Sequence, residues 1–186
     1  MINLINSLTA IRILLAPIIL ILLINGNNLL CTLLFFLAGV TDFLDGYLAR
    51  KYNAESQIGE ILDPIADKII VIFILFGLAV ALNSYLISFM SALIISREIG
   101  VAALRDYSAR NNLFNKTKVT FLAKTKTAIQ LSTIGLYLFA ITLNINLLIV
   151  ISDILLILAT LITLYTDINT QPMYLKNEYF CSKWWL

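Results

Sequence analysis

Six apolar runs alternate with polar breaks along the chain. They cover, approximately, residues 8–24, 29–47, 59–82, 85–104, 128–143 and 147–165. A helix needs about 20 predominantly apolar residues to cross the hydrocarbon core of a bilayer. Inside that core every backbone polar group must be satisfied within the chain, so such runs are expected to be helices. The pattern predicts an all-α, polytopic integral membrane protein with six transmembrane helices, built as a single domain over residues 1–186.

The polar breaks between these runs are of two kinds. One kind carries no charge and covers residues 25–28, 83–85 and 144–146. The other kind is expected to form longer polar connections, holds eight Lys and Arg residues, and covers residues 48–58 and 105–127. Positively charged connections stay on the cytoplasmic side of a membrane. We therefore expect both charged connections and both termini to be cytoplasmic, in a bacterial inner or cell membrane.

The composition agrees with a membrane location. Of the 186 residues 60% are hydrophobic, and the mean hydropathy is +0.92, whereas an average soluble domain is about 45–50% apolar. The chain has no His, and its two Cys, Cys31 and Cys181, lie far apart in the sequence. A zinc site built from nitrogen and sulfur ligands is therefore excluded, and no disulfide is indicated.

Four aspartates stand where the second apolar run ends and the third begins. On a helix Asp42 and Asp45 are three residues apart and Asp63 and Asp67 are four apart, so each pair shares one face. A single charge near a helix end is usually solvated, but two facing pairs would gather four carboxylates at the mouth of two membrane helices. Such carboxylates repel one another and need cations. An all-oxygen site of this kind indicates Mg²⁺ or Mn²⁺.

The residues between the two pairs suit a diphosphate ligand. Gly46 and Gly59 leave room for a ligand to approach the backbone. Ala49 keeps the neighbouring surface low, and Arg50 offers a planar fork of donors to phosphate oxygens. The whole stretch reads D-x2-D-G-x2-A-R-x8-G-x3-D-x3-D over residues 42–67. It resembles, at every position and spacing, the signature of the CDP-alcohol phosphotransferases (class I).

This resemblance implies an enzyme that transfers a phosphatidyl or related group from a CDP-linked donor to an alcohol and releases CMP. It implies two divalent cations, Mg²⁺ or Mn²⁺, held by Asp42, Asp45, Asp63 and Asp67. Asp67 resembles the general base of the family, which takes the proton of the acceptor hydroxyl. The residues implied to bind the CDP-linked lipid are Thr9, Gly46, Ala49, Arg50, Ser56 and Gly59.

Three further stretches resemble the phosphatidylglycerophosphate synthases within this family. They are N-S-L-T-x2-R-x4-P at residues 6–17, S-R-E-I-G-V-A-A-L-R at 96–105, and A-K-T-K-T-A-I-Q at 123–130. In the last stretch Ala123 replaces the usual Gly. The resemblance implies CDP-diacylglycerol as donor and glycerol 3-phosphate as acceptor. Three cations, Arg97, Arg105 and Lys126, would suit the phosphate of that acceptor better than they would suit an uncharged alcohol.

Other acceptors fit the same signature, namely serine, inositol phosphate or phosphatidylglycerol. A cation transporter is the alternative from a different class, since carboxylates within a membrane also mark ion pathways. The aspartates cluster at one interface instead of the midplane, and no internal repeat is evident, which favours the enzyme. As partners we expect membrane lipids and a second copy of the chain in a homodimer, and no nucleic acid.

Two charged residues outside the signature lie within apolar runs. Arg12, one turn into the first run, either extends to the membrane interface or faces a polar site. Asp153 lies in the sixth run, and the sequence assigns it no role.

Overall fold

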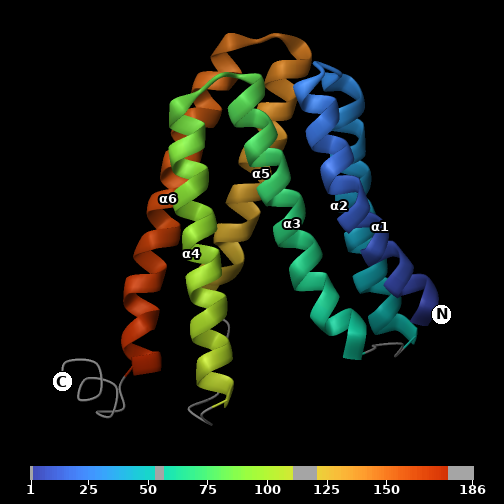
Figure 1. Ribbon diagram of the computed structural model, residues 1–186, viewed down its shortest axis with the longest axis vertical. Coiled ribbons are helices and arrows are strands. Elements are labelled where there is room, and N and C mark those ends of the chain that lie inside the picture. Colours follow the sequence, from blue (N-terminus) through green and yellow to red (C-terminus); the bar gives the residue numbers. More distant parts are fainter. Residues whose placement is uncertain (1, 53–56, 111–120, 176–186) are drawn as a thin grey trace.

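Helices make up nearly all of the described chain. The computed structural model describes residues 2–52, 57–110 and 121–175, with side chains for 7–47, 51, 59, 62–63, 65–103 and 128–165 (Figure 1). Six helices occupy these residues: α1 (Ile2–Ile24), α2 (Asn28–Tyr52), α3 (Gln57–Ala81), α4 (Tyr85–Arg110), α5 (Phe121–Leu143) and α6 (Asn146–Leu175). The prediction of an all-α protein is confirmed.

Four of the described helices contain segments long and apolar enough to cross a membrane. These segments are Ser7–Ile24 in α1, Asn28–Tyr47 in α2, Tyr85–Ala103 in α4 and Asn146–Tyr165 in α6. A shorter apolar segment, Ala128–Leu143, lies in α5. The first half of α3 carries the charged residues Glu60, Asp63, Asp67 and Lys68. Length and composition thus identify four of the six expected spans.

Three turns of one design join the helices in pairs. One or two residues after the last residue of α1, α3 and α5 comes a residue with a left-handed backbone, namely Gly26 (φ 75°), Asn83 (φ 46°) and Asn144 (φ 54°). In each turn the next N–H is donated to the carbonyl five residues earlier. These bonds are Asn27 to Leu22 (2.9 Å), Ser84 to Ala79 (3.1 Å) and Ile145 to Ala140 (3.0 Å). Gly and Asn tolerate this backbone region better than other residues do, so the predicted uncharged breaks are confirmed as helix caps.

Several helices extend further than the apolar pattern predicts. Helix α1 already begins at Ile2, and α2 continues to Tyr52 through part of the stretch predicted as a polar connection, residues 48–58. Likewise α4 runs on to Arg110 and α5 begins at Phe121, inside the predicted connection 105–127. The reason is that Leu, Ala, Arg and Lys are strong helix formers. A helix can continue in polar sequence after its apolar run has ended.

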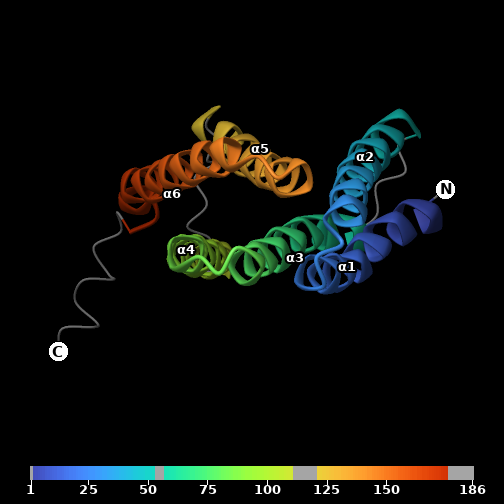
Figure 2. The ribbon, with the colours of Figure 1, turned by 90° about the horizontal axis from the view of Figure 1, so that it is seen from above.

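The bundle has two chemically different ends. The three tight turns gather at one end, and the ends of the helices that adjoin the charged connections lie at the other (Figure 1). Seen from above, α4, α3 and α1 form one row (Figure 2). Helices α6 and α5 form a second row beside it, and α2 lies past the end of α5, next to α1. Helix α1 packs against α2 and α3, while α2 contacts α5. Large apolar side chains such as Leu14, Phe43 and Leu147 point outward, as contact with lipid requires.

Helices α1 and α3 approach each other closely at Gly77. A Cβ atom added to Gly77 would lie 2.7 Å from Leu23 Cδ1 and 3.2 Å from Leu20 Cδ1. Lipid tails are as apolar as Leu, so membrane helices associate through close packing, for which small residues make room. This contact holds α1 and α3 together near the tight turns.

Asp153, which had no role at the level of sequence, joins α6 to α5. The hydroxyl of Tyr137 donates a 2.5 Å hydrogen bond to Asp153 Oδ1, and Tyr137 is fully buried. A phenol buried in an apolar bundle needs such an acceptor. The pair therefore fixes the register of α5 against α6.

We expect Gly77→Leu to lower the melting temperature of the protein in detergent micelles. The added side chain overpacks the α1–α3 contact, which typically costs about 1–3 kcal/mol of unfolding free energy. The matched control is Gly100→Leu on α4, because an added Cβ at Gly100 meets nothing within 4 Å. Thermal unfolding of the two purified variants checks the prediction, and equal melting temperatures would contradict it.

Candidate active site

The four predicted aspartates come together at the end of the bundle that lies opposite the tight turns. Asp42 and Asp45 lie in the second half of α2, and Asp63 and Asp67 lie in the first half of α3. These two helix halves lie at the end opposite the tight turns (Figure 1). Their exposure differs: the side chain of Asp45 is 4% exposed, whereas the other three range from 43% to 57%. One carboxylate is therefore enclosed, and three remain accessible.

The guanidinium of Arg12, on α1, lies between these carboxylates. Its Nη1 contacts Asp42 Oδ1 and is 2.8 Å from Asp67 Oδ1. Its Nη2 is 2.8 Å from Asp45 Oδ2 and 3.4 Å from Asp63 Oδ1. The side chain of Arg12 is only 1% exposed. Of the two possibilities left open for Arg12, the structure shows the second, a residue that faces a polar site.

Thr9 approaches the same carboxylates one turn earlier on α1. Its Oγ1 donates a 2.7 Å hydrogen bond to Asp63 Oδ1, and Thr9 is fully buried. Thr9 and Arg12 are three positions apart, so both side chains lie on one face of the helix. The structure thus brings Thr9, predicted to bind the CDP-linked lipid, next to the predicted metal ligands.

The charge of the cluster is only partly balanced. Arg12 supplies one positive charge to four carboxylates, and carboxylates in close proximity repel one another unless cations neutralise them. The contacted oxygens face the guanidinium, and within the described residues no group of three or more ligating side chains is arranged to hold one ion. The donor set nevertheless fits Mg²⁺ or Mn²⁺, because it consists of carboxylate oxygens that converge on a cation.

The other residues predicted to bind the CDP-linked lipid are placed in part. Gly46 follows Asp45 on α2, and Gly59 is buried in the first turn of α3. Ala49 and Arg50 belong to the last turns of α2, but their side chains lie outside the described residues. All of Ser56 also lies outside them.

The predicted acceptor ligand Arg97 belongs to a second charged cluster, between α3 and α4. Its Nη1 donates a 2.5 Å hydrogen bond to Glu98 Oε1, and Lys68 Nζ is 3.7 Å from Glu98 Oε2. Lys68 directly follows Asp67 on α3, so the two clusters adjoin. Arg105 lies on α4 and Lys126 on α5, with side chains outside the described residues, so their convergence with Arg97 stays a prediction.

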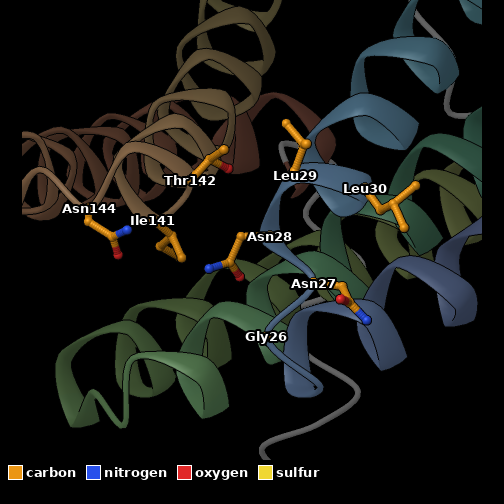
Figure 3. Close-up of a pocket in the computed structure, with 8 residues that line it drawn as sticks. All are labelled: Gly26, Asn27, Asn28, Leu29, Leu30, Ile141, Thr142 and Asn144. Atoms are coloured by element: carbon orange, nitrogen blue, oxygen red, sulfur yellow. The ribbon is translucent and has the colours of Figure 1, made fainter.

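A pocket of about 390 Å³ lies at the opposite end of the bundle, beside the α1–α2 and α5–α6 turns (Figure 3). Its lining residues are Gly26, Asn27, Asn28, Leu29, Leu30, Ile141, Thr142 and Asn144. None of them carries a charge or a group that titrates near neutral pH, so the pocket offers no cationic side chain to a diphosphate and no side-chain acid or base for proton transfer. The carboxylate cluster is therefore the candidate active site.

Comparison with known proteins agrees with the signature in α2 and α3. Residues 2–168 match the family described as CDP-alcohol phosphatidyltransferases. The chain belongs to this family. A CDP-alcohol phosphatidyltransferase is an enzyme of the transferase class. The four aspartates of the candidate active site belong to the signature in α2 and α3.

Similar CDP-alcohol phosphatidyltransferases carry the name CDP-diacylglycerol–glycerol-3-phosphate 3-phosphatidyltransferase. The protein of that name from Haemophilus influenzae is 36% identical over 165 residues, which cover 87% of this chain and 88% of that protein. The one from Rickettsia bellii is 38% identical over 168 residues, or 88% and 91% of the two chains. The one from Rickettsia typhi is 42% identical over 132 residues, or 69% and 72%.

Arg12 is the site residue of this CDP-alcohol phosphatidyltransferase that the sequence did not assign. Its signal was a cation inside an apolar run, with Thr9 one turn before it on the same face. The pattern of a single helix cannot show which neighbouring helix that face meets. The packing of α1 on both α2 and α3 supplies this information.

We expect Thr9→Val to destabilise the protein by removing the hydrogen bond to Asp63. A hydrogen bond to a charged group contributes about 1.5–3 kcal/mol, and the melting temperature should fall accordingly. Thr160→Val on α6 is the matched control, because buried Thr160 donates only to Leu156 O within its own helix. Thermal unfolding in detergent compares the two variants. A similar loss of stability in both would show that the contact with Asp63 contributes nothing of its own.

Proposed function

We propose that this enzyme transfers the phosphatidyl group of CDP-diacylglycerol to sn-glycerol 3-phosphate, which gives phosphatidylglycerophosphate and CMP. The observation that carries the proposal is the convergence of all four signature aspartates, from α2 and α3, on one point. Donor and acceptor are taken from the names of relatives that align with most of the chain.

Two divalent cations, Mg²⁺ or Mn²⁺, are proposed to bind at Asp42, Asp45, Asp63 and Asp67. The four side chains already surround one cation, the guanidinium of Arg12, and offer only oxygen donors. When bound, such cations neutralise the donor diphosphate and make its phosphorus more electrophilic. The absence of side chains at Gly46 and Gly59 leaves space for the diphosphate beside the carboxylates, and Arg50 would add a further positive charge.

Asp67 is proposed as the general base because it is the most accessible of the four carboxylates. Its side chain is 57% exposed, whereas that of Asp45 is 4% exposed and closed to an incoming acceptor. The hydroxyl of glycerol 3-phosphate would donate its proton to Asp67. The hydroxyl oxygen then forms a bond to the phosphorus that carries the diacylglycerol oxygen. The bond from that phosphorus to CMP breaks, and CMP leaves with the electron pair.

The acceptor phosphate is proposed to bind at Arg97, Arg105 and Lys126. Arg97 supports this role by its place on α4, where its partner Glu98 also pairs with Lys68, the residue after Asp67. Arg105 lies eight residues, or just over two turns, beyond Arg97 on the same continuous helix. Residues eight apart on a helix lie on roughly one face, so both positions belong to one side of α4.

The proposed setting is a membrane that all six helices cross, with the carboxylates at its cytoplasmic face. The three uncharged turns at one end and the charged sequence at the other support this orientation. The acyl chains of the donor would stay in the bilayer beside α2 and α3 while its head group reacts. We further propose that the enzyme works as a homodimer.

The purified enzyme should release CMP from CDP-diacylglycerol fastest when glycerol 3-phosphate is the acceptor. Serine, inositol phosphate, phosphatidylglycerol and free glycerol, each supplied in turn with Mg²⁺ or Mn²⁺, serve as alternative acceptors. The anionic phosphate is expected to contribute charge-assisted contacts that free glycerol lacks, and rates with glycerol should be lower by about tenfold or more. Equal rates with glycerol or serine would end the proposal of a phosphate-binding acceptor site.

Asp67→Asn should lower turnover at least about a hundredfold, the usual contribution of a general base, even at saturating divalent cation and CDP-diacylglycerol, because Asn cannot take a proton. Asp42→Asn is the comparison, since loss of a metal ligand should weaken donor binding and metal dependence together. Steady-state kinetics and donor binding distinguish the two variants. Turnover of Asp67→Asn within tenfold of the wild type would exclude the general-base role.

A further inference from the structure

One side chain contacts every carboxylate of the active site. The two terminal nitrogens of Arg12 carry four N–H donors, and each nitrogen lies close to one carboxylate of α2 and one of α3. The Nε atom of Arg12 is buried and has no hydrogen-bond partner in the described part of the chain. The side chain thus contacts the carboxylates through Nη1 and Nη2 alone. These two nitrogens form a planar fork, whose geometry matches that of a carboxylate.

The position of Arg12 is costly unless these contacts persist. A guanidinium that is 1% exposed has lost its water, and a buried ion is tolerated only with excellent geometry and full pairing. The same reasoning applies to the enclosed carboxylate of Asp45, for which Arg12 Nη2 is a partner at 2.8 Å. Arg12 and the aspartates therefore stabilise each other when no other cation is bound.

Divalent cations and Arg12 approach the same oxygens. The proposed metal ligands are the four side chains that already contact the guanidinium. Positive charges at such short distances repel each other strongly, since Coulomb energy falls only with the first power of distance. The presence of Arg12 among the carboxylates must therefore lower their affinity for a divalent cation. By thermodynamic reciprocity, a bound cation must weaken the contacts between Arg12 and the carboxylates to the same extent.

We propose that Arg12 is the internal counter-cation of the active site, which keeps the four carboxylates assembled in the metal-free enzyme and lowers their affinity for divalent metal. This inference rests on the metal site proposed above. It assigns Arg12 a positioning role, because the residue acts on the ligands and is not assigned any contact with a substrate. Thr9, which holds Asp63 from the same face of α1, supports the assembly without adding charge.

The test measures Mn²⁺ binding and thermal stability of the purified full-length enzyme in detergent, with Mn²⁺ or with chelator. Arg12→Gln should bind Mn²⁺ about tenfold more tightly than the wild type, because a competing positive charge is gone. Its melting temperature should fall in chelator and recover when Mn²⁺ is added. Arg12→Lys keeps the charge but loses the fork. It should bind Mn²⁺ like the wild type and lose part of its metal-free stability.

Tyr137→Phe serves as the control, since it removes a buried hydrogen bond between α5 and α6 and leaves the four carboxylates around Arg12 unchanged. Its stability should fall equally with and without Mn²⁺, and its Mn²⁺ affinity should not change. If Arg12→Gln behaves in the same way, Arg12 is only a structural brace and the inference is overturned. If the wild-type enzyme itself binds no Mn²⁺, the proposed metal site fails, which is a different result from unchanged affinity in the variant.

Discussion

The contact between one buried arginine and four aspartates governs the geometry of this enzyme. It joins three helices that are separate in sequence, because Arg12 comes from α1, two carboxylates come from α2 and two from α3. Ionic contacts in a buried setting tolerate little displacement, since a lost partner leaves an unpaired charge away from water. The three helices must therefore keep a common register at this end. At the other end the close approach of Gly77 to Leu23 restrains two of the same helices through packing alone.

The two ends of the bundle are held together by different kinds of contact. The tight turns use left-handed caps and backbone hydrogen bonds, and they need no charged side chain. Charged clusters gather at the opposite end, where the carboxylates adjoin Lys68, Glu98 and Arg97. Away from the charged end, single hydrogen bonds join neighbouring helices, such as Thr32 to Thr142 at 2.9 Å near the turns and Tyr137 to Asp153 at 2.5 Å. Such bonds set register without creating a second reactive centre.

The sequence predicts most of this architecture, and the failures have physical causes. The helices and the pairing of the aspartates follow from periodicity, because residues three or four apart share a helix face wherever the helix is placed. Helix ends such as Tyr52 and Arg110 were missed because polar helix formers continue a helix after the apolar run ends. The partner of Asp153 and the contacts of Arg12 were missed because both depend on which faces of two helices meet. That choice is made in tertiary packing, which periodicity does not encode.

The distribution of charge between helices has a consequence for how the chain enters a membrane. Helices α1 and α2 form one hairpin whose turn, at Gly26, carries no ionised group, so the hairpin can insert without moving a charge across the lipid. Arg12, Asp42 and Asp45 all belong to this first hairpin. Two of the four aspartates therefore have their cationic neighbour within the hairpin itself. The two aspartates of α3 complete the cluster, so the packing of α3 onto this hairpin also assembles the candidate active site.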